Sequence, residues 1–131
     1  MKVARTIPLA LAIVIALGCN QGSSPTEPGP RTVTLAVRQT ATIASGVTLS
    51  FDRVVSDSRC PSGVACVWVG EVTLALTLSG PGGTEAFTLS DQSPMRVVDG
   101  YTVQLISVEP SPTTGSTIPE SSYRATIRAS R

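Results

Sequence analysis

The sequence predicts an all-β protein whose 131 residues hold a single antiparallel β-sandwich or small barrel of seven to eight strands. Short stretches of alternating apolar and polar residues follow one another, and clusters of glycine, proline, serine and aspartate separate them. Beyond the N-terminal segment, no stretch has apolar residues at helical spacing. A period of two gives each strand one buried side, so the strands are expected to enclose one core.

Eight stretches carry the strand pattern. In chain order they are residues 32–38, 39–44, 47–52, 68–78, 85–90, 95–98, 101–108 and 123–129. Turn-forming residues at Ser45-Gly46, 79–83 and Asp99-Gly100 favour tight connections between neighbouring strands. The buried parity switches near Ile106, which predicts a bulge there or a strand that is buried on both sides.

The longest strand signal begins at the only tryptophan of the chain. Trp68 shares its parity with Leu74 and Leu76 within an unbroken alternating run. Because tryptophan is mostly buried in small domains, we expect Trp68 to lie in the core, close to Cys66. Gly70, on the same parity, would leave room for a bulky neighbour or mark a bulge. The alternative is an exposed Trp68 that anchors a ligand.

Two of the three cysteines, Cys60 and Cys66, stand just before this run. Between them, Pro61 and Gly63 permit a tight turn that brings the two sulfur atoms within disulfide distance. On the chain-entropy model, a loop this short gains about 2–2.5 kcal/mol. The alternative is a pair of metal ligands, but two cysteines in a chain without histidine make a poor zinc site.

Residues 57–70 carry a motif that resembles one found in uncharacterised small bacterial secreted proteins and lipoproteins. The motif is D-S-R-C-P, a second cysteine and then x-W-x-G before a long apolar strand. The matching residues are Asp57, Ser58, Arg59, Cys60, Pro61, Cys66, Trp68 and Gly70. The resemblance implies a fold and an envelope location but no activity. Within the motif, we expect Asp57 and Arg59 to form an ion pair or to cap the disulfide turn.

The N-terminus has the organisation of a secretory signal peptide. Two basic residues precede an apolar run over residues 7–17, which is too short to span a bilayer comfortably. The run ends in Ala16-Leu17-Gly18-Cys19, which resembles the bacterial lipobox, although Ala16 stands where leucine is usual. The resemblance implies cleavage before Cys19 and acylation of that cysteine, with palmitate among the acyl chains. The alternative is an ordinary signal peptide with a chance cysteine.

Three segments follow from this interpretation. Residues 1–18 form the lipoprotein signal peptide, residues 19–31 a lipid-anchored flexible tether, and residues 32–131 the all-β domain. The tether is rich in proline, serine and glycine and has no large apolar residue, so we do not expect it to fold. By analogy with lipoprotein sorting in two-membrane bacteria, the absence of aspartate after the cysteine favours the outer membrane, facing the periplasm. Acylation of Cys19 would leave the other two cysteines to pair.

Few side chains are available for catalysis. The chain has no histidine, and its single lysine, Lys2, belongs to the predicted signal peptide. The mature chain therefore lacks the Ser-His, Cys-His and Ser-Lys pairs that activate a nucleophile, and it has no P-loop or dinucleotide fingerprint. Its carboxylates stand mostly at turns or at outward positions, with no spacing typical of glycosidase or calcium sites. We expect no catalytic residue, no metal and no cofactor.

The charges of the chain are nearly balanced. Removing Lys2 and Arg5 from its 10 basic residues leaves eight, against nine acidic ones. This balance argues against binding of nucleic acid and against a basic membrane-binding patch. Arg124 and Arg128 face outward on the last predicted strand, where they would discourage edge-to-edge pairing if that strand lay at an edge.

The expected function is a lipid-anchored, non-catalytic binding or structural module of the envelope. Its candidate partners are an envelope protein or a glycan, in addition to the membrane that holds its lipid. One alternative is an inhibitor or accessory protein that presents the loop between Cys60 and Cys66 to an enzyme. Another is a disulfide redox protein, although the spacing is not Cys-x-x-Cys and a predicted strand, rather than a helix, follows Cys66.

Overall fold

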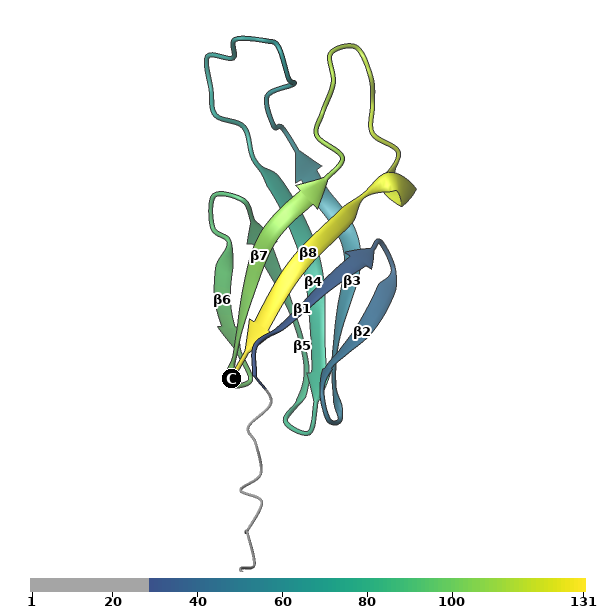
Figure 1. Cartoon of the computed structure of the whole chain (residues 1–131), viewed down its shortest axis with the longest axis vertical. Helices are drawn as coiled ribbons and strands as arrows, with labels where there is room; N and C mark the ends of the chain where they lie inside the picture. Colours follow the sequence, from purple (N-terminus) through teal and green to yellow (C-terminus); the bar gives the residue numbers. More distant parts are fainter. Residues whose placement is uncertain (1–28) are drawn as a thin grey trace, which may run out of the picture.

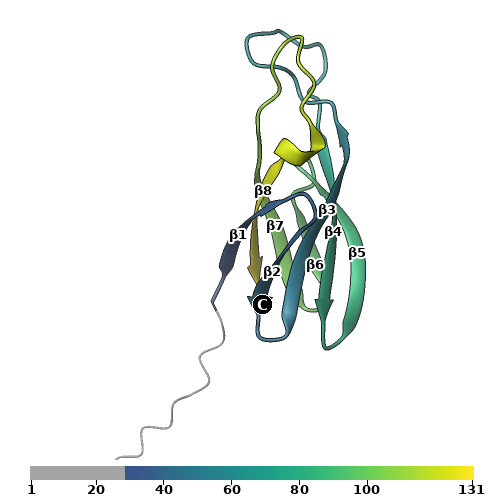
Figure 2. The same cartoon turned by 90° about the vertical axis from the view of Figure 1, so that its right-hand side faces the viewer.

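The structure, a computed structural model, describes residues 29–131 and shows two four-stranded antiparallel sheets packed as an open sandwich (Figure 1, Figure 2). The strands are β1 (Arg31–Ala36), β2 (Gln39–Ala44), β3 (Val47–Asp57), β4 (Val72–Gly80), β5 (Gly83–Ser90), β6 (Met95–Val98), β7 (Tyr101–Glu109) and β8 (Arg124–Ser130). One sheet has the order β1-β8-β7-β6 and the other β2-β3-β4-β5. The predicted all-β fold is confirmed, and it is a sandwich rather than a closed barrel.

The predicted signal peptide, Cys19 and most of the predicted tether lie outside the described residues. β1 begins at Arg31, one residue before the expected start of the domain. Within residues 29–131 the helical structure consists of the short 3-10 turn η1 (Glu120–Ser122). No helix in this part of the chain is long and apolar enough to cross a membrane.

Alternating side chains from the two sheets meet in one core. On β4 the buried positions are the even ones from Val72 to Leu78, and on β8 they are the odd ones from Ala125 to Ala129. The residues between them face outward and are mostly threonine, alanine or arginine. Full burial of one large aliphatic side chain is worth about 1.5–3 kcal/mol, so this interleaved core is the main source of stability.

Two backbone features predicted from the sequence are confirmed. Asp99 and Gly100 connect β6 to β7 with φ values of 47° and 76°, as a two-residue hairpin turn with the twist of its strands requires. The pairing of β7 with β8 shifts register between Leu105 and Ser107, which places a bulge at Ile106.

The predicted burial of Trp68 is wrong. β4 begins only at Val72, so residues 68–71 belong to a loop, and the side chain of Trp68 is 83% exposed. The alternating pattern continues through this loop in the sequence. In the structure, however, the pairing of β3 with β4 stops after one further backbone hydrogen bond, from Ser58 to Glu71, and the residues between these two form the loop.

The last strand also differs from one expectation. β8 lies between β1 and β7, so its outward arginines do not protect a sheet edge. Instead, Nη1 of Arg124 donates to the carbonyl oxygens of Ser121 and Tyr123 over 2.9 and 2.8 Å. Arg124 thereby fastens η1 to the start of β8.

Two long loops lie side by side at one end of the sandwich, as both views show (Figure 1, Figure 2). We call residues 58–71, between β3 and β4, the Trp68 loop, and residues 110–119, after β7, the proline-rich loop. The N–H of Ser62 donates to the carbonyl oxygen of Pro112 over 3.2 Å and so joins the two loops. The start of β1 at Arg31 and the C-terminus lie toward the opposite end (Figure 1).

Candidate functional site

The base of the Trp68 loop is closed by reciprocal pairing of Ser58 with Glu71. The N–H of Ser58 donates to the carbonyl oxygen of Glu71 over 2.8 Å, and the Ser58 hydroxyl donates to the same oxygen over 3.1 Å. In return, the N–H of Glu71 donates to Oγ of Ser58 over 3.0 Å. A side chain at Gly70 would overlap the Ser58 carbonyl oxygen, so the close approach of the two segments requires glycine there. The space expected beside Gly70 is thus taken by backbone.

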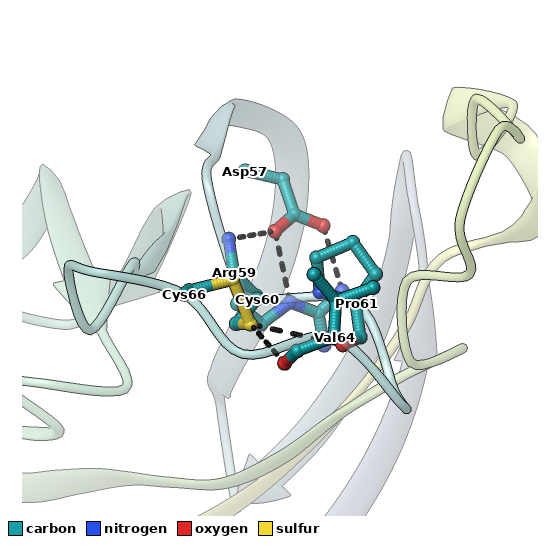
Figure 3. The surroundings of a disulfide bond; sticks show 6 residues. All are labelled: Asp57, Arg59, Cys60, Pro61, Val64 and Cys66. Atoms are coloured by element: carbon teal, nitrogen blue, oxygen red, sulfur yellow. Dashed lines mark hydrogen bonds and ion pairs between the residues drawn. A yellow bond between two sulfur atoms is a disulfide. The ribbon is translucent and has the colours of Figure 1, made fainter.

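Asp57 and Arg59 form the predicted ion pair beside this base (Figure 3). Nε and Nη2 of Arg59 donate to the two carboxylate oxygens of Asp57 over 2.9 and 2.7 Å. The backbone N–H of Arg59 also donates to this carboxylate, over 3.2 Å. The Arg59 and Asp57 side chains are only 14% and 11% exposed. The bidentate pair is therefore worth more than one on the open surface.

The same ion pair connects three strand ends. Arg59 donates from Nη1 to the carbonyl oxygen of Val108 and from Nη2 to that of Pro110, each over 2.9 Å. The phenol of Tyr123 donates to Oδ2 of Asp57 over 2.8 Å. These bonds join the end of β3 to the end of β7 and to the residue before β8. We call Asp57, Arg59 and Tyr123 the strand-end cluster, which fixes the roots of both loops.

The protonation states of the strand-end cluster follow from its contacts. Burial acts to raise the pKa of Asp57, but hydrogen bonds from Arg59 and Tyr123 outweigh it and hold that pKa below its ordinary value. Burial, together with the hydrogen bond to Asp57, raises the pKa of Tyr123 to about 12. The hydrogen bond to Asp57 raises the pKa of Arg59. At neutral pH the cluster is a carboxylate, a guanidinium and a neutral phenol, an arrangement suited to holding structure.

The predicted disulfide between Cys60 and Cys66 is present, with Cα atoms 6.0 Å apart. Within its ring, the N–H of Val64 donates to the carbonyl oxygen of Pro61 over 3.3 Å, and Gly63 has a φ of 80°. Sγ of Cys60 lies 3.2 Å from the Val64 carbonyl oxygen (Figure 3). This is a packing contact, because a disulfide sulfur carries no proton. Pro61 and Gly63 therefore form the tight turn that the sequence predicts.

The part of the Trp68 loop between Cys66 and Gly70 presents three consecutive apolar side chains to solvent. Val67, Trp68 and Val69 are 89%, 83% and 86% exposed. They border an open cleft of about 720 Å³, which is lined by residues 66–71, Ser58 and Gln92. The cleft therefore combines an aromatic ring with a hydroxyl, a carboxylate and an amide, the mixture of apolar surface and few polar groups that is typical of ligand sites.

All the motif residues except Trp68 hold the loop in place. Asp57 and Arg59 belong to the strand-end cluster, the cysteines and Pro61 shape the disulfide turn, and Gly70 permits the closed base of the loop. Trp68 alone among them has no part in holding the loop. Sequence reasoning missed the contributions of Glu71, Gln92 and Tyr123. Only Tyr123 left a signal, since a phenol on a buried parity needs a hydrogen-bond partner.

No protein-family model, curated protein or solved structure matches the chain. Among residues 29–131, no group of three or more histidine, cysteine, aspartate or glutamate side chains is arranged to hold a metal ion. The geometry of the Trp68 loop is therefore the principal observation from which a function is argued.

Proposed function

We propose that the protein is a lipid-anchored, non-catalytic binding module of the bacterial envelope, and that it contacts its ligand through the Trp68 loop. The observation that carries this proposal is the exposure of Val67, Trp68 and Val69 on a loop fixed at its root. An exposed tryptophan beside two exposed valines does not contribute to the stability of the folded chain. Such surfaces are typical of binding sites, where tryptophan is enriched among the residues that dominate affinity.

The construction of the loop supports the same proposal. The Ser58–Glu71 pairing closes its base, the disulfide closes a ring within it, and Arg59 fixes its root to neighbouring segments. Each of these contacts reduces the conformational freedom that the loop would otherwise lose on binding. A loop ordered before it meets its ligand loses less entropy in the complex.

The position of the loop is consistent with display from a membrane. The Trp68 loop and the start of β1 lie at opposite ends of the sandwich (Figure 1). A chain anchored through acylated Cys19 would reach β1 through residues 20–30, which span at most about 40 Å when fully extended. The attachment point and the Trp68 loop would then lie at opposite ends of the domain, which leaves the loop free to meet a ligand. We propose the outer membrane, facing the periplasm, as the location.

One alternative function has a specific observation in its favour. The disulfide-closed ring of residues 60–66 projects with the Trp68 loop beyond the ends of the sheets (Figure 1). A rigid protruding loop of this kind also suits an inhibitor or accessory protein that inserts a segment into the cleft of an enzyme. In that case the partner would contact Val64 and its neighbours as well as Trp68.

Site-specific photo-cross-linking in the native envelope tests the proposed function. A diazirine-bearing amino acid replaces Val69, which leaves Trp68 in place, and the control position is Val97 on β6, which is 67% exposed. We expect a discrete adduct from position 69 that is absent from position 97 and is lost when Trp68→Ala is added. Equal labelling at both positions, or labelling unaffected by Trp68→Ala, would exclude the Trp68 loop as the binding element.

A further inference from the structure

The cleft beside Trp68 is closed on one side by a second, independently fixed turn. Gln92 lies between β5 and β6, next to Asp91. Asp91 pairs with Val72, the first residue of β4. The N–H of Val72 donates to the Asp91 carboxylate over 3.0 Å, and the N–H of Asp91 donates to the Val72 carbonyl oxygen over 3.3 Å. Since Glu71 immediately precedes Val72 and Gln92 immediately follows Asp91, this pairing brings Glu71 and Gln92 to the lining of the same cleft.

The charge of this end of the molecule restricts the ligands it can take. Residues 60–70 and 110–119 contain no charged side chain. Within residues 29–131 the single ion pair is that of Asp57 with Arg59, so Glu71 keeps an uncompensated negative charge in the cleft. The Arg59 guanidinium is occupied by Asp57, Val108 and Pro110 and does not line the cleft. Phosphates and carboxylates therefore find repulsion there and no cation to bind.

We infer that the ligand is a neutral pyranose glycan, stacked on the indole of Trp68 and hydrogen-bonded by the Glu71 carboxylate and the Gln92 amide. This inference rests on the proposed function and names its ligand. A pyranose ring has an apolar face of C–H groups that packs on an exposed aromatic ring, and its hydroxyls donate to a carboxylate and exchange hydrogen bonds with an amide. The cleft is open along the surface, which suits a chain rather than an enclosed small molecule.

Two other occupants use less of the site. A bilayer would cover Val67, Trp68 and Val69, but it would bring Glu71 towards apolar surroundings without a partner, which is unfavourable for a charge. An apolar protein pocket would meet the same difficulty. A neutral glycan satisfies the indole, the carboxylate and the amide together.

Intrinsic fluorescence tests the inference directly, because Trp68 is the only tryptophan of the chain. Full-length protein in a detergent without a sugar headgroup is titrated with cellohexaose and with hexa-N-acetylchitohexaose, both of them neutral. We expect a saturable change in emission and weaker quenching by acrylamide with at least one of them. Polygalacturonate, an anionic chain, should bind at least about tenfold more weakly, a difference of about 1.4 kcal/mol.

Variants of the polar groups give the second readout. Glu71→Gln and Gln92→Ala should each weaken glycan binding about two- to tenfold, the loss expected for one hydrogen bond. Glu71→Gln should also narrow the preference for neutral over anionic chains, an effect that a purely structural role would not produce. Glu85→Gln, at an exposed position of β5, is the matched control and should leave the affinities for neutral and for anionic chains unchanged.

Several results would overturn the glycan inference while leaving the proposed function intact. One is that Trp68 fluorescence does not respond to either neutral chain. Another is that the emission shifts to the blue only with phosphatidylcholine vesicles. A third is that position 69 forms a Trp68-dependent adduct with a protein while no glycan changes the fluorescence. Unchanged affinity in both Glu71→Gln and Gln92→Ala would also overturn it. Photo-cross-linking that does not depend on Trp68 would remove the proposed function and the glycan inference together.

Discussion

The phenol of Tyr123 donates a hydrogen bond to the carboxylate of Asp57, which stands 66 positions earlier, over 2.8 Å. This contact links the last residue of β3 to the residue that precedes β8, across strands that belong to different sheets. Arg59 donates to both oxygens of the same carboxylate. The loop-bearing end of the sandwich is therefore joined by polar contacts as well as by the apolar core.

Tyr123→Phe should destabilise the domain by about 1.5–3 kcal/mol, because it removes a hydrogen bond to a charged group. Asp57→Ala should cost more, since it leaves the Arg59 guanidinium partly buried without its anion. Urea denaturation of both variants and of the parent protein measures these differences. A Tyr123→Phe variant as stable as the parent would show that the bond contributes nothing to stability.

The strand-end cluster predicts the response of stability to acid. The pKa of Asp57 lies below its ordinary value in the folded protein, so its contribution is complete above the unfolded-state pKa near 3.9 and is lost as the pH falls through the folded-state pKa. We expect the parent protein to lose stability below about pH 4 more steeply than Asp57→Asn. Denaturation curves across this range provide the measurement. Identical acid slopes would contradict the lowered pKa.

Trp68→Ala should leave the free energy of unfolding within about 0.5 kcal/mol of the parent value, because the side chain is exposed. Leu76→Ala, at a fully buried position of β4, should cost about 2–5 kcal/mol and serves as the comparison. The emission spectrum of the parent should be that of a solvated indole. A large loss of stability in Trp68→Ala would instead place the ring in the core.

Gly70→Ala should disrupt the base of the Trp68 loop, because its methyl group would overlap the Ser58 carbonyl oxygen. Hydrogen exchange should accelerate at the amides of Ser58 and Glu71, which bond across that base. Gly29→Ala is the matched control, since nothing lies within 4 Å of the added carbon there. Unchanged protection at both amides in Gly70→Ala would mean that the base adapts to a side chain.

Acylation of Cys19 is expected from the segment Leu17-Gly18-Cys19. Mass spectrometry of the mature N-terminus should show a cysteine carrying acyl chains, and Cys19→Ser should release the protein from the membrane fraction, because several acyl chains are needed for firm anchoring. A mature N-terminus that begins at another residue, or an unmodified Cys19, would contradict the lipoprotein assignment.

The fold was predictable from the sequence because strand alternation is a local signal. Each inward set, such as the even positions of β4, is determined by the need to bury apolar side chains on one face. The bulge at Ile106 and the hairpin at Asp99-Gly100 were predictable for the same reason, since a parity switch and a turn dipeptide are both visible in the chain. The disulfide and the Asp57–Arg59 pair involve residues close together in sequence.

The site was less predictable because it depends on contacts between distant segments. Nothing near Gln92 indicates that its turn lies along the same cleft as Trp68. The misplacement of Trp68 has a specific cause, because the alternating pattern runs through the loop without a break. The pairing of β3 with β4 stops at Ser58 and Glu71, and this limit depends on two segments that 12 residues separate in the sequence.

The contacts that hold the Trp68 loop lie at its root and in its disulfide ring, whereas Val67, Trp68 and Val69 support nothing else in the fold. Substitution at positions 67–69 is therefore free of the usual conflict between a new binding preference and the stability of the domain. Chains that keep the root and vary positions 67–69 would present different chemistry on an unchanged frame. This end of the sandwich is thus a natural place to graft or randomise a recognition sequence.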